Sequence, residues 1–510
     1  MKRGQLFTVT AYSSALRLLA QIVALISGLT IASTFGETDS YYAALILPAA
    51  LANLAINILT NLFAPIYLEH IHTDPAQRRP ILASLTFFVT IALVVGIIIS
   101  LVAVPISIHL RGGQTDSSAT IFGVSLVALV PLLGYSRLTA IICEAHQHYR
   151  APALAALLNP LTFLITLLIL LPHLSIYSLL CANLAGHSVE LLAVSIYARR
   201  RLQIPFRPSP RLHPAIREML LRSLLPALTY GALFFVPTLD RLTASILSTG
   251  SLTAFHYGER LVTALDLLII TSVVTVASNQ WAQRAAERGI DSAAQTANDV
   301  FSLLLFVLMP IITIGAVLSH SLLALLFQHG AYTNVDASAQ VFAILLVSAP
   351  FNYLIVLNVR LLLIARDVRA QAILSLGIAL LNALLDVALA PLLGLTGIAL
   401  STLVARALIF VLSRYLLHRR IPSIHFRPLL PNLIRTLISA TTMLVVLLIL
   451  DVLFSPALSG SIAHQIAALG LMITASGIIY LSAAALLRHP DLLQMIPTFR
   501  LPTLTRLNRA

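Results

Sequence analysis

Long apolar stretches, separated by short polar breaks, run through almost the whole chain. Crossing a hydrocarbon core of about 30 Å takes roughly 20 helical residues, and each stretch reaches that length. The pattern therefore predicts an all-α polytopic membrane protein with about 14 transmembrane helices, at roughly 7–34, 40–68, 81–108, 119–145, 152–171, 176–198, 219–248, 252–281, 296–319, 338–364, 370–391, 395–417, 429–453 and 463–487.

The positive charges predict how these helices are oriented. When the chain is threaded back and forth from Met1, the even-numbered breaks hold almost all of the loop arginines, and the odd-numbered breaks hold only Arg111. Loops rich in Lys and Arg stay on the cytoplasmic side during insertion. A wrong number of helices would scramble this alternation. The charge pattern therefore supports the helix count and a topology with both termini in the cytoplasm.

Composition excludes an ordinary soluble protein. Hydrophobic residues make up 58% of the chain and charged residues only 10%, with a mean hydropathy of +0.94; soluble domains average about 25% charged residues. The cytoplasmic loops account for the net charge of +13, so we expect contacts with anionic membrane lipids and no nucleic-acid partner. Cys143 and Cys181 both fall in apolar helices, which indicates neither a disulfide framework nor a metal site.

The two halves of the chain share a pattern that predicts an internal repeat. The segments 113–122 and 330–342 have similar composition, and each is followed eight or nine residues later by a proline, Pro131 or Pro350. The matched helices cross in the same direction, as in the parallel repeats of alternating-access transporters. The predicted domains are an N-lobe at 1–198 (helices 1–6), a basic cytoplasmic linker at 199–218, a C-lobe at 219–418 (helices 7–12), helices 13 and 14 at 419–487, and a cytoplasmic tail at 488–510.

Ionisable residues inside the apolar stretches are the first candidates for a functional site. Such a residue at mid-bilayer costs roughly 2.5–3.5 kcal/mol on insertion scales, so it usually faces a cavity or a partner. The eighth predicted helix carries Glu259, Arg260 and Asp266 close together. Two interpretations stay open: this helix lines a cavity and contacts an anionic headgroup, or its charges form a salt bridge to helix 7 or helix 2.

The first two helices carry further candidates. Arg17 would be costly against lipid, which favours a position facing a cavity. Asn53 and Asn57 lie four residues apart, a spacing typical of interhelical hydrogen bonding and compatible with substrate contact. Asp39 lies at the outer mouth of the second helix. Structural pairing is the favoured interpretation for three others: Glu190, Asp386 and Arg406.

Three segments carry a resemblance to a known family. Residues 35–42 with Leu47-Pro48 resemble the first outer turn and second helix of the lipid II flippase family (MurJ/MviN). Tyr257-Gly258-Glu259-Arg260-Leu261 resembles its helix 8 motif, and residues 326–333 resemble the loop after its helix 9. The resemblance spans the whole chain and places it in the multidrug/oligosaccharidyl-lipid/polysaccharide exporter superfamily. The family's charged motif in the first helix is replaced here by the uncharged segment 20–28, with Arg17 one turn earlier.

The resemblance implies a flippase. Family members move an undecaprenyl-diphosphate-linked peptidoglycan precursor from the inner to the outer leaflet, with a cationic cavity for the diphosphate and a lipid-tail groove formed by helices 13 and 14. Membrane potential and ions are implicated in resetting the cycle. We therefore expect a bacterial inner-membrane transporter, not an enzyme, with no cofactor or metal and with coupling ions left open. The predicted substrate-binding residues are Arg17, Asp39, Asn53, Asn57, Glu259, Arg260 and Asp266.

Three alternatives remain at this point. The substrate can be another polyprenyl-linked oligosaccharide, since helices 1 and 2 lack cations that the family usually carries. The chain can be a cation-coupled drug antiporter of the same superfamily, with Asp240, Asp266 or Asp386 as the coupling carboxylate. It can also be a scaffold that joins cell-envelope synthesis proteins without transport.

Overall fold

The computed structural model describes residues 3–36, 38–60, 67–68, 78–110, 117–202, 208–222, 224–328, 330–424, 429–458 and 460–495. In these ranges every regular element is helical and none is a strand, which confirms the all-α class. Among the described residues, eleven helices are long and apolar enough to cross a membrane. The predicted count of fourteen is not confirmed, because the segments predicted at 40–68, 219–248 and 252–281 contain none of these eleven spans.

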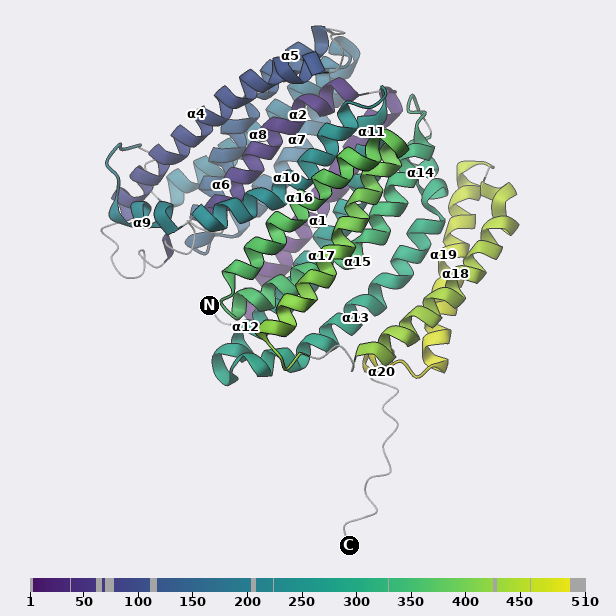
Figure 1. Ribbon diagram of the computed structural model, residues 1–510. Helices are drawn as coiled ribbons and strands as arrows, with labels where there is room; N and C mark the ends of the chain where they lie inside the picture. Colours follow the sequence, from purple (N-terminus) through teal and green to yellow (C-terminus); the bar gives the residue numbers. More distant parts are fainter. Residues whose placement is uncertain are drawn as a thin grey trace. The chain divides into compact units, whose positions relative to one another are not determined.

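The helices follow one another along the chain with short connections (Figure 1). Those in the first half are α1 (Arg3–Thr34), α2 (Asp39–Ile58), α4 (Arg78–Leu110), α5 (Ser117–Leu126), α6 (Leu129–Ala145), α7 (Arg150–Leu174), α8 (Tyr177–Tyr197), the π-turn η3 (Ala198–Leu202), α9 (Pro214–Arg222) and α10 (Leu224–Ser245). Those in the second half are α11 (Ser251–Ile269), the π-turn η4 (Ile270–Val274), α12 (Thr275–Arg288), α13 (Ile290–Val317), α14 (Ser319–Phe327), α15 (Val335–Ile364), α16 (Val368–Leu393), α17 (Leu395–Arg420), α18 (Leu430–Leu458), α19 (Ile462–Leu486) and α20 (Pro490–Met495).

Several predicted helices are interrupted. The stretch predicted at 119–145 consists of α5 and α6, which meet at a turn around Ala128. Pro131 lies just after this turn; it has no N–H to donate, and its ring crowds the carbonyl four residues earlier, so an unbroken helix is disfavoured here. The stretch predicted at 252–281 is interrupted by η4, where the Thr275 hydroxyl donates to the Ile270 carbonyl at 2.8 Å. Such π-turns often lie at functional sites.

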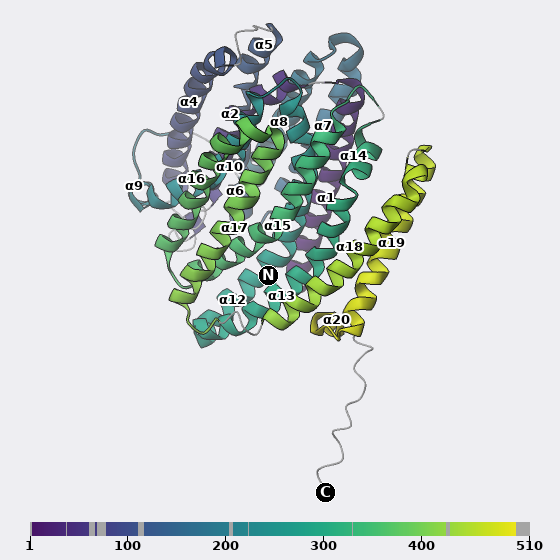
Figure 2. The ribbon, with the colours of Figure 1, turned by 45° about the vertical axis from the view of Figure 1, so that its right-hand side comes forward.

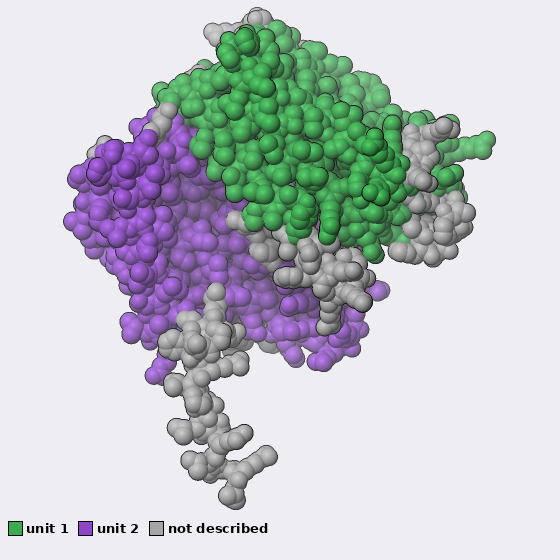
Figure 3. Space-filling model, turned by 180° about the vertical axis from the view of Figure 1, so that it is seen from behind, with its two compact units in different colours: residues 1–256, 330–333, 375–387 green, residues 257–329, 334–374, 388–510 purple. Residues whose placement is uncertain are grey.

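The chain divides into two compact units (Figure 3). Unit 1 comprises residues 1–256, 330–333 and 375–387, and unit 2 comprises residues 257–329, 334–374 and 388–510. In unit 1, α1 packs along α7 and α7 along α8, while α2 packs against α5, α6 and α10. In unit 2, α15 packs along α17, and α13 packs against α12, α15 and α18. The predicted lobe boundaries at 198, 219 and 418 stay a prediction.

Helices α18 and α19 form a hairpin at the C-terminal end of unit 2 (Figure 2). One face of the hairpin packs against α13, where Phe306 contacts Met443 and Tyr480 in a buried cluster. The Tyr480 hydroxyl donates to the Phe306 carbonyl at 2.7 Å. The remaining faces are rich in exposed Leu, Ile and Val, as expected for a hairpin that contacts lipid on most sides.

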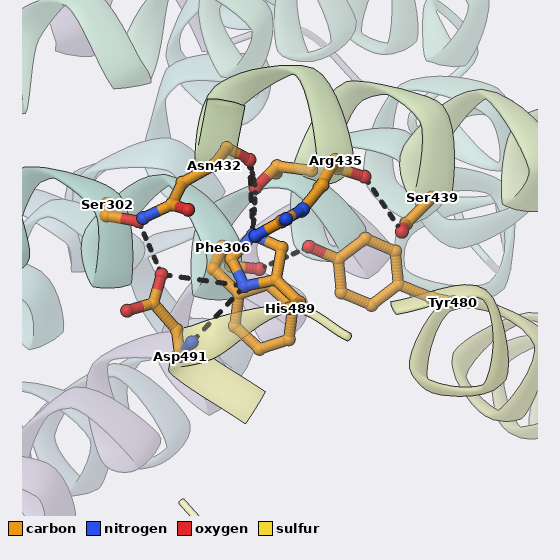
Figure 4. Close-up of polar contacts among 9 residues, drawn as sticks. Ser302, Phe306, Asn432, Arg435, Ser439, Tyr480, His489 and Asp491 are labelled. Carbon is orange, nitrogen blue, oxygen red and sulfur yellow. Dashed lines mark hydrogen bonds and ion pairs between the residues drawn. The ribbon is translucent and has the colours of Figure 1, made fainter. Parts of the chain in front are cut away.

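A buried polar cluster fixes the turn that follows this hairpin (Figure 4). The His489 ring is fully buried and stacks on Phe306 at a centroid distance of 4.6 Å. Its Nε2 lies 2.9 Å from the Thr436 hydroxyl, and its Nδ1 accepts from the Asp491 amide. The Asp491 carboxylate accepts from the Ser302 hydroxyl. These contacts attach α20, which lies within the predicted tail, to α13 and α18.

The cluster predicts a pH-dependent contribution to stability. Burial lowers the pKa of His489, and burial raises the pKa of Asp491. The folded chain therefore keeps His489 neutral, whereas the unfolded chain takes up a proton near pH 6.5. The stability contributed by this histidine is present above that pH and is lost as the pH falls below it. The raised pKa of Asp491 acts in the opposite direction, because the folded chain binds that proton more readily.

We expect the His489→Ala variant to lose about 2–3 kcal/mol of unfolding free energy at pH 7.5, because it removes buried hydrogen bonds and an aromatic contact. The loss should be smaller at pH 5.5, where protonation of His489 in the unfolded wild type already lowers the stability that this ring contributes. Thermal unfolding of purified protein in detergent at both pH values measures this. His464→Ala, which changes an exposed histidine bonded to Ser461, is the control. An equal loss at both pH values would contradict the assignment.

Candidate functional site

The charged residues of α11 form the centre of the candidate site. Glu259, Arg260 and Asp266 are all partly buried in a helix that carries no other charge. Glu259 and Asp266 are seven residues apart, close to two helical turns, so their side chains lie on one face. The Thr263 hydroxyl donates to the Glu259 carbonyl at 3.0 Å, which leaves it engaged within the helix. The spacing therefore presents two carboxylates and a guanidinium along one helix.

Asp266 has charged and polar neighbours on two other helices of unit 2. It interacts electrostatically with Arg406 on α17 and with Tyr353 on α15. The Arg406 Nη1 donates to the Ser348 hydroxyl at 2.7 Å. Among the described residues, Asp266 Oδ1 has no hydrogen-bond partner although it is buried. The ionised form of a buried carboxylate is stabilised by nearby positive charge, which Arg406 supplies here.

A glycine brings α11 close to α15. A Cβ at Gly258 would lie 2.6 Å from the Ser338 carbonyl oxygen, so no other residue fits without a shift of the backbone. The neighbouring Tyr257 is fully buried and stacks on Phe327 at a centroid distance of 4.7 Å. The Tyr257-Gly258 pair thus sets the position of Glu259 and Arg260 against the rest of unit 2.

Asp39 caps the N-terminus of α11 in unit 1. Its carboxylate accepts from the Gly250 amide at 2.8 Å and from the Thr253 amide at 2.7 Å. The Thr253 hydroxyl donates to the same carboxylate and accepts from the Thr38 amide at 3.1 Å. The carboxylate at the start of α2 therefore satisfies amide groups that the first turn of α11 leaves unpaired. Asp39 thus joins the start of α2 to the start of α11.

The segment 330–333 contacts the end of α1 at two glycines. The Ala331 amide donates to the Ser33 carbonyl at 3.1 Å. A Cβ at Gly330 would lie 2.2 Å from the Ser33 Cα, and a Cβ at Gly36 would lie 2.8 Å from the Ala331 carbonyl oxygen. Both glycines belong to segments that carry the family resemblance. Their physical role is to let two backbones approach.

The remaining predicted site residues belong to unit 1. Arg17 on α1 and Asn53 on α2 are both exposed at the surface of the unit. The side chain of Asn57 lies outside the described part of the chain. The structure therefore brings Glu259, Arg260 and Asp266 together on one helix of the candidate site, and it gives Asp39 a capping role.

Two carboxylates in unit 1 share one amide. Asp240 on α10 and Asp386 on α16 are 5% and 1% exposed. The Asn382 Nδ2 donates to Asp240 Oδ1 at 2.6 Å and to Asp386 Oδ2 at 3.2 Å. Both carboxylates were candidates from the sequence, whereas Asn382 was not. The four-residue spacing of Asn382 and Asp386, which puts them on one face of a helix, was the available signal.

The residues expected to pair structurally do so. Glu190 accepts from Asn159 at 2.7 Å and lies 3.3 Å from His187, Arg406 donates to Ser348, and Asp386 contacts Asn382. Within the described residues, no group of three or more His, Cys, Asp or Glu side chains could hold a metal ion. The buried polar groups therefore divide into pairs that stabilise helix packing and the charged cluster around α11.

Comparison with known proteins yields one family. The model of the family described as lipid II flippase MurJ matches residues 31–468. The search of the curated proteins gives no match. The matched range includes α11, the segments 35–42 and 330–333, all of α18 and the first residues of α19.

Solved structures with similar folds include a lipid II flippase and transporters of the MOP superfamily. A lipid II flippase MurJ in an inward closed conformation aligns with a TM-score of 0.77 at 18% identity, covering 94% of this chain and 99% of that one. An inward-facing multidrug resistance MATE family transporter of the MOP superfamily aligns with a TM-score of 0.66 at 12% identity, covering 81% and 98%. A MOP superfamily transporter from Pyrococcus furiosus aligns with a TM-score of 0.56 at 12% identity, covering 82% and 94%. These similarities establish the fold.

Proposed function

The chain belongs to the lipid II flippase MurJ family, and from that premise we propose that it moves an undecaprenyl-diphosphate-linked peptidoglycan precursor from the inner to the outer leaflet of the bacterial inner membrane by alternating access. The physical problem is a charged, sugar-bearing headgroup that cannot cross hydrocarbon unaided. A polar cavity replaces its water while the isoprenoid tail stays in lipid. The protein acts as a transporter and catalyses no covalent step.

The partial burial of the charged Arg260 side chain is the observation that carries the proposal. Its side chain lies between Glu259 and Asp266 on a largely apolar helix, and it is only partly buried. A guanidinium binds diphosphate oxygens through paired, charge-assisted hydrogen bonds. In the proposed cavity, Arg260 and Arg17 bind the diphosphate, and Asn53 and Asn57 bind sugar or peptide groups.

The acidic residues act when the headgroup is absent. Glu259 and Asp266 then pair with the cations of the cavity, which keeps these cations from facing an apolar, empty space. Asp39 holds the first turn of α11 at the outer end. Rocking of the two proposed lobes exposes the cavity to each leaflet in turn, and the bound headgroup shifts the population between the two states.

An exposed, mainly apolar face of α18 supports a path for the isoprenoid tail. It consists of Ile434, Leu437, Ile438, Thr441, Thr442, Val445 and Val446. Aliphatic side chains and threonine methyl groups suit a hydrocarbon chain. We place the tail there while the headgroup passes through the cavity. The loop arginines favour a topology with both termini in the cytoplasm, and the proposed partners are membrane lipids and cell-envelope synthesis proteins.

The proposal is tested by reconstitution. Purified protein in liposomes should accelerate the appearance of a lipid II headgroup at the opposite leaflet, measured by its accessibility to an added enzyme or label. Mass spectrometry of lipid that co-purifies with the protein should detect a polyprenyl-diphosphate glycan, and its mass separates lipid II from another oligosaccharide. Vesicles that show no acceleration for any polyprenyl-diphosphate glycan would contradict the function.

The two carboxylates bonded to Asn382 favour coupling of transport to the movement of a cation. Such coupling is the property that defines the antiporter alternative. Asp240 and Asp386 are buried within helices and share one amide donor. Two ionised carboxylates this close repel each other strongly in a medium of low dielectric constant. Uptake of a proton or of a sodium ion would relieve the repulsion. We propose that this pair couples cation binding to the transport cycle.

We expect the Asp386→Asn variant to abolish any dependence of transport on a sodium or proton gradient and to slow gradient-driven transport at least tenfold. The reason is that one neutral amide removes the need for a bound cation. Transport into proteoliposomes with imposed gradients measures this. Glu190→Gln is the matched control, since Glu190 is a membrane carboxylate paired with an amide and a histidine. Equal gradient dependence in both variants would contradict coupling at Asp386.

A further inference from the structure

A polar cavity lies beside the outer turn of the last helix hairpin in unit 2. It has a volume of about 690 Å³, within the range of about 300–1,000 Å³ typical of small-molecule sites. We name it the hairpin cavity. Its polar lining comes from three helices, α14, α18 and α19: His320, Ser321, Gln328, Asp451, Ser455 and Gln465. None of the residues predicted to bind substrate contributes to it.

The carboxylate in this cavity stands in a membrane-spanning helix. Asp451 is partly buried and lies seven residues before the end of α18, which is about 10 Å along the helix axis. Within the described part of the chain, no side chain or amide forms an ion pair or hydrogen bond with it. An ionisable residue in a span is costly and marks a functional site by default. The cavity gives Asp451 an opening toward a ligand.

Two side chains of the hairpin offer acceptors beside Asp451. The Ser455 hydroxyl donates its proton to the Val452 carbonyl at 3.0 Å. The Gln465 amide nitrogen donates to the Gly460 carbonyl at 3.1 Å. These bonds use donor hydrogens within the hairpin, so the Ser455 oxygen and the Gln465 carbonyl join Asp451 as acceptors. A ligand that satisfies three separated acceptors must carry several donors.

Among the described residues, the lining contains no Arg or Lys, so a diphosphate finds no counter-charge from them there. A single ammonium group could engage Asp451 but would leave the amide and hydroxyl acceptors on the other elements without a donor. A sugar presents several hydroxyl or amide donors at spacings of a few ångströms, and it also accepts from groups such as Gln328. The hydrogen-bond inventory therefore favours a saccharide over a phosphate or a simple amine.

We propose that the hairpin cavity binds the saccharide of a polyprenyl-linked glycan at the outer face of the membrane. The assignment of the outer face and of the glycan rests on the proposed function and its topology. After transport, the headgroup lies outside the bilayer while its tail is still close to α18. Asp451, Ser455 and Gln465 hold the sugar beside the hairpin. The site retains the product at the exit and slows its return to the central cavity.

A contact between His320 and Asp336 lies at the α14 wall of the cavity. His320 Nε2 lies 3.0 Å from Asp336 Oδ1 at the start of α15. This contact attaches the short helix α14 to α15, which also packs along it. On the other side, Leu318 and Leu322 pack against Leu447 and Leu469 of the hairpin. The polar cavity therefore rests on a packed apolar base.

The test uses the full-length protein in phosphatidylcholine nanodiscs and the soluble disaccharide of two N-acetylglucosamine units. We expect saturation-transfer NMR to detect binding. Asp451→Leu and Gln465→Leu should each weaken it at least tenfold, and Asp451→Asn should weaken it less than Asp451→Leu. His464→Ala, an exposed position on the same turn outside the lining, should leave it unchanged. Elution volume and thermal unfolding show that each variant is folded.

Two results would overturn the proposal. One is disaccharide binding that Asp451→Leu and Gln465→Leu leave unchanged. The other is no disaccharide binding while phosphatidylethanolamine is retained through Asp451, which would identify an ammonium headgroup as the ligand. Flipping is measured on the same preparations. Normal flipping without disaccharide binding contradicts this inference alone, whereas disaccharide binding without flipping contradicts the proposed function alone.

Discussion

We expect the Arg260→Ala variant to insert and fold normally and to lose flipping to below one hundredth of the wild-type rate. Arg260 is only partly buried, so its loss opens no large cavity in the core. In the proposed mechanism, its guanidinium binds the diphosphate while water is excluded. A hydrogen bond to a charged group contributes about 1.5–3 kcal/mol, and a paired contact in a site of low dielectric constant contributes more. Headgroup accessibility in proteoliposomes measures the rate.

Conservative substitution separates charge from geometry at this position. Arg260→Lys keeps the positive charge but loses the planar fork of donors, so an intermediate rate is expected. Arg284→Ala, which removes an exposed arginine of α12, is the matched control and should keep the wild-type rate. Wild-type flipping by Arg260→Ala, with folded protein at equal density, would rule out the assigned role.

Hydrophobic length was sufficient to predict most of the helices, because a helix that crosses the bilayer needs about 20 apolar residues. The stretches at 152–171, 395–417 and 463–487 correspond to α7, α17 and α19, with ends that agree within a few residues. Length could not predict α14, because its nine residues are too few to cross the bilayer. It also follows α13 directly, separated only by a break at Leu318. Length also could not find α20, which owes its place to the buried contacts of His489.

The candidate site was only partly accessible from sequence. A charged residue in an apolar stretch can be recognised from the sequence alone, which is why Arg260 and Asp266 were predicted as site residues. The partners of such charges depend on packing, and Tyr353 and Ser348 on α15 looked like ordinary residues of an apolar helix. The motif glycine Gly258 could be recognised by resemblance, but its reason, contact with the Ser338 carbonyl, required coordinates.

The second large effect is expected at Asp39. Its carboxylate accepts two amide N–H bonds and one hydroxyl bond from the Gly250–Thr253 turn. Loss of a cap costs about 0.5–2 kcal/mol, and a carboxylate with three donors should be at or above the upper end. We expect Asp39→Ala to reduce flipping more than tenfold and to increase amide hydrogen exchange at residues 250–256. Asp39→Asn keeps one acceptor oxygen and should be intermediate in both measurements.

A second helix cap, at the N-terminus of α16, allows the effect of losing a cap on local stability to be separated from its effect on transport. Asp367 caps α16 through one bond from the Ala370 amide at 3.0 Å, so Asp367→Ala removes the same kind of contact away from α11. It should raise exchange around its own helix and leave flipping within about twofold of wild type. If Asp39 bound the headgroup directly instead of capping α11, Asp39→Ala would lose flipping while exchange at residues 250–256 stayed at the wild-type level. The joint change in exchange and rate is therefore what assigns Asp39 to holding α11, and through α11 to positioning Arg260 in the same helix.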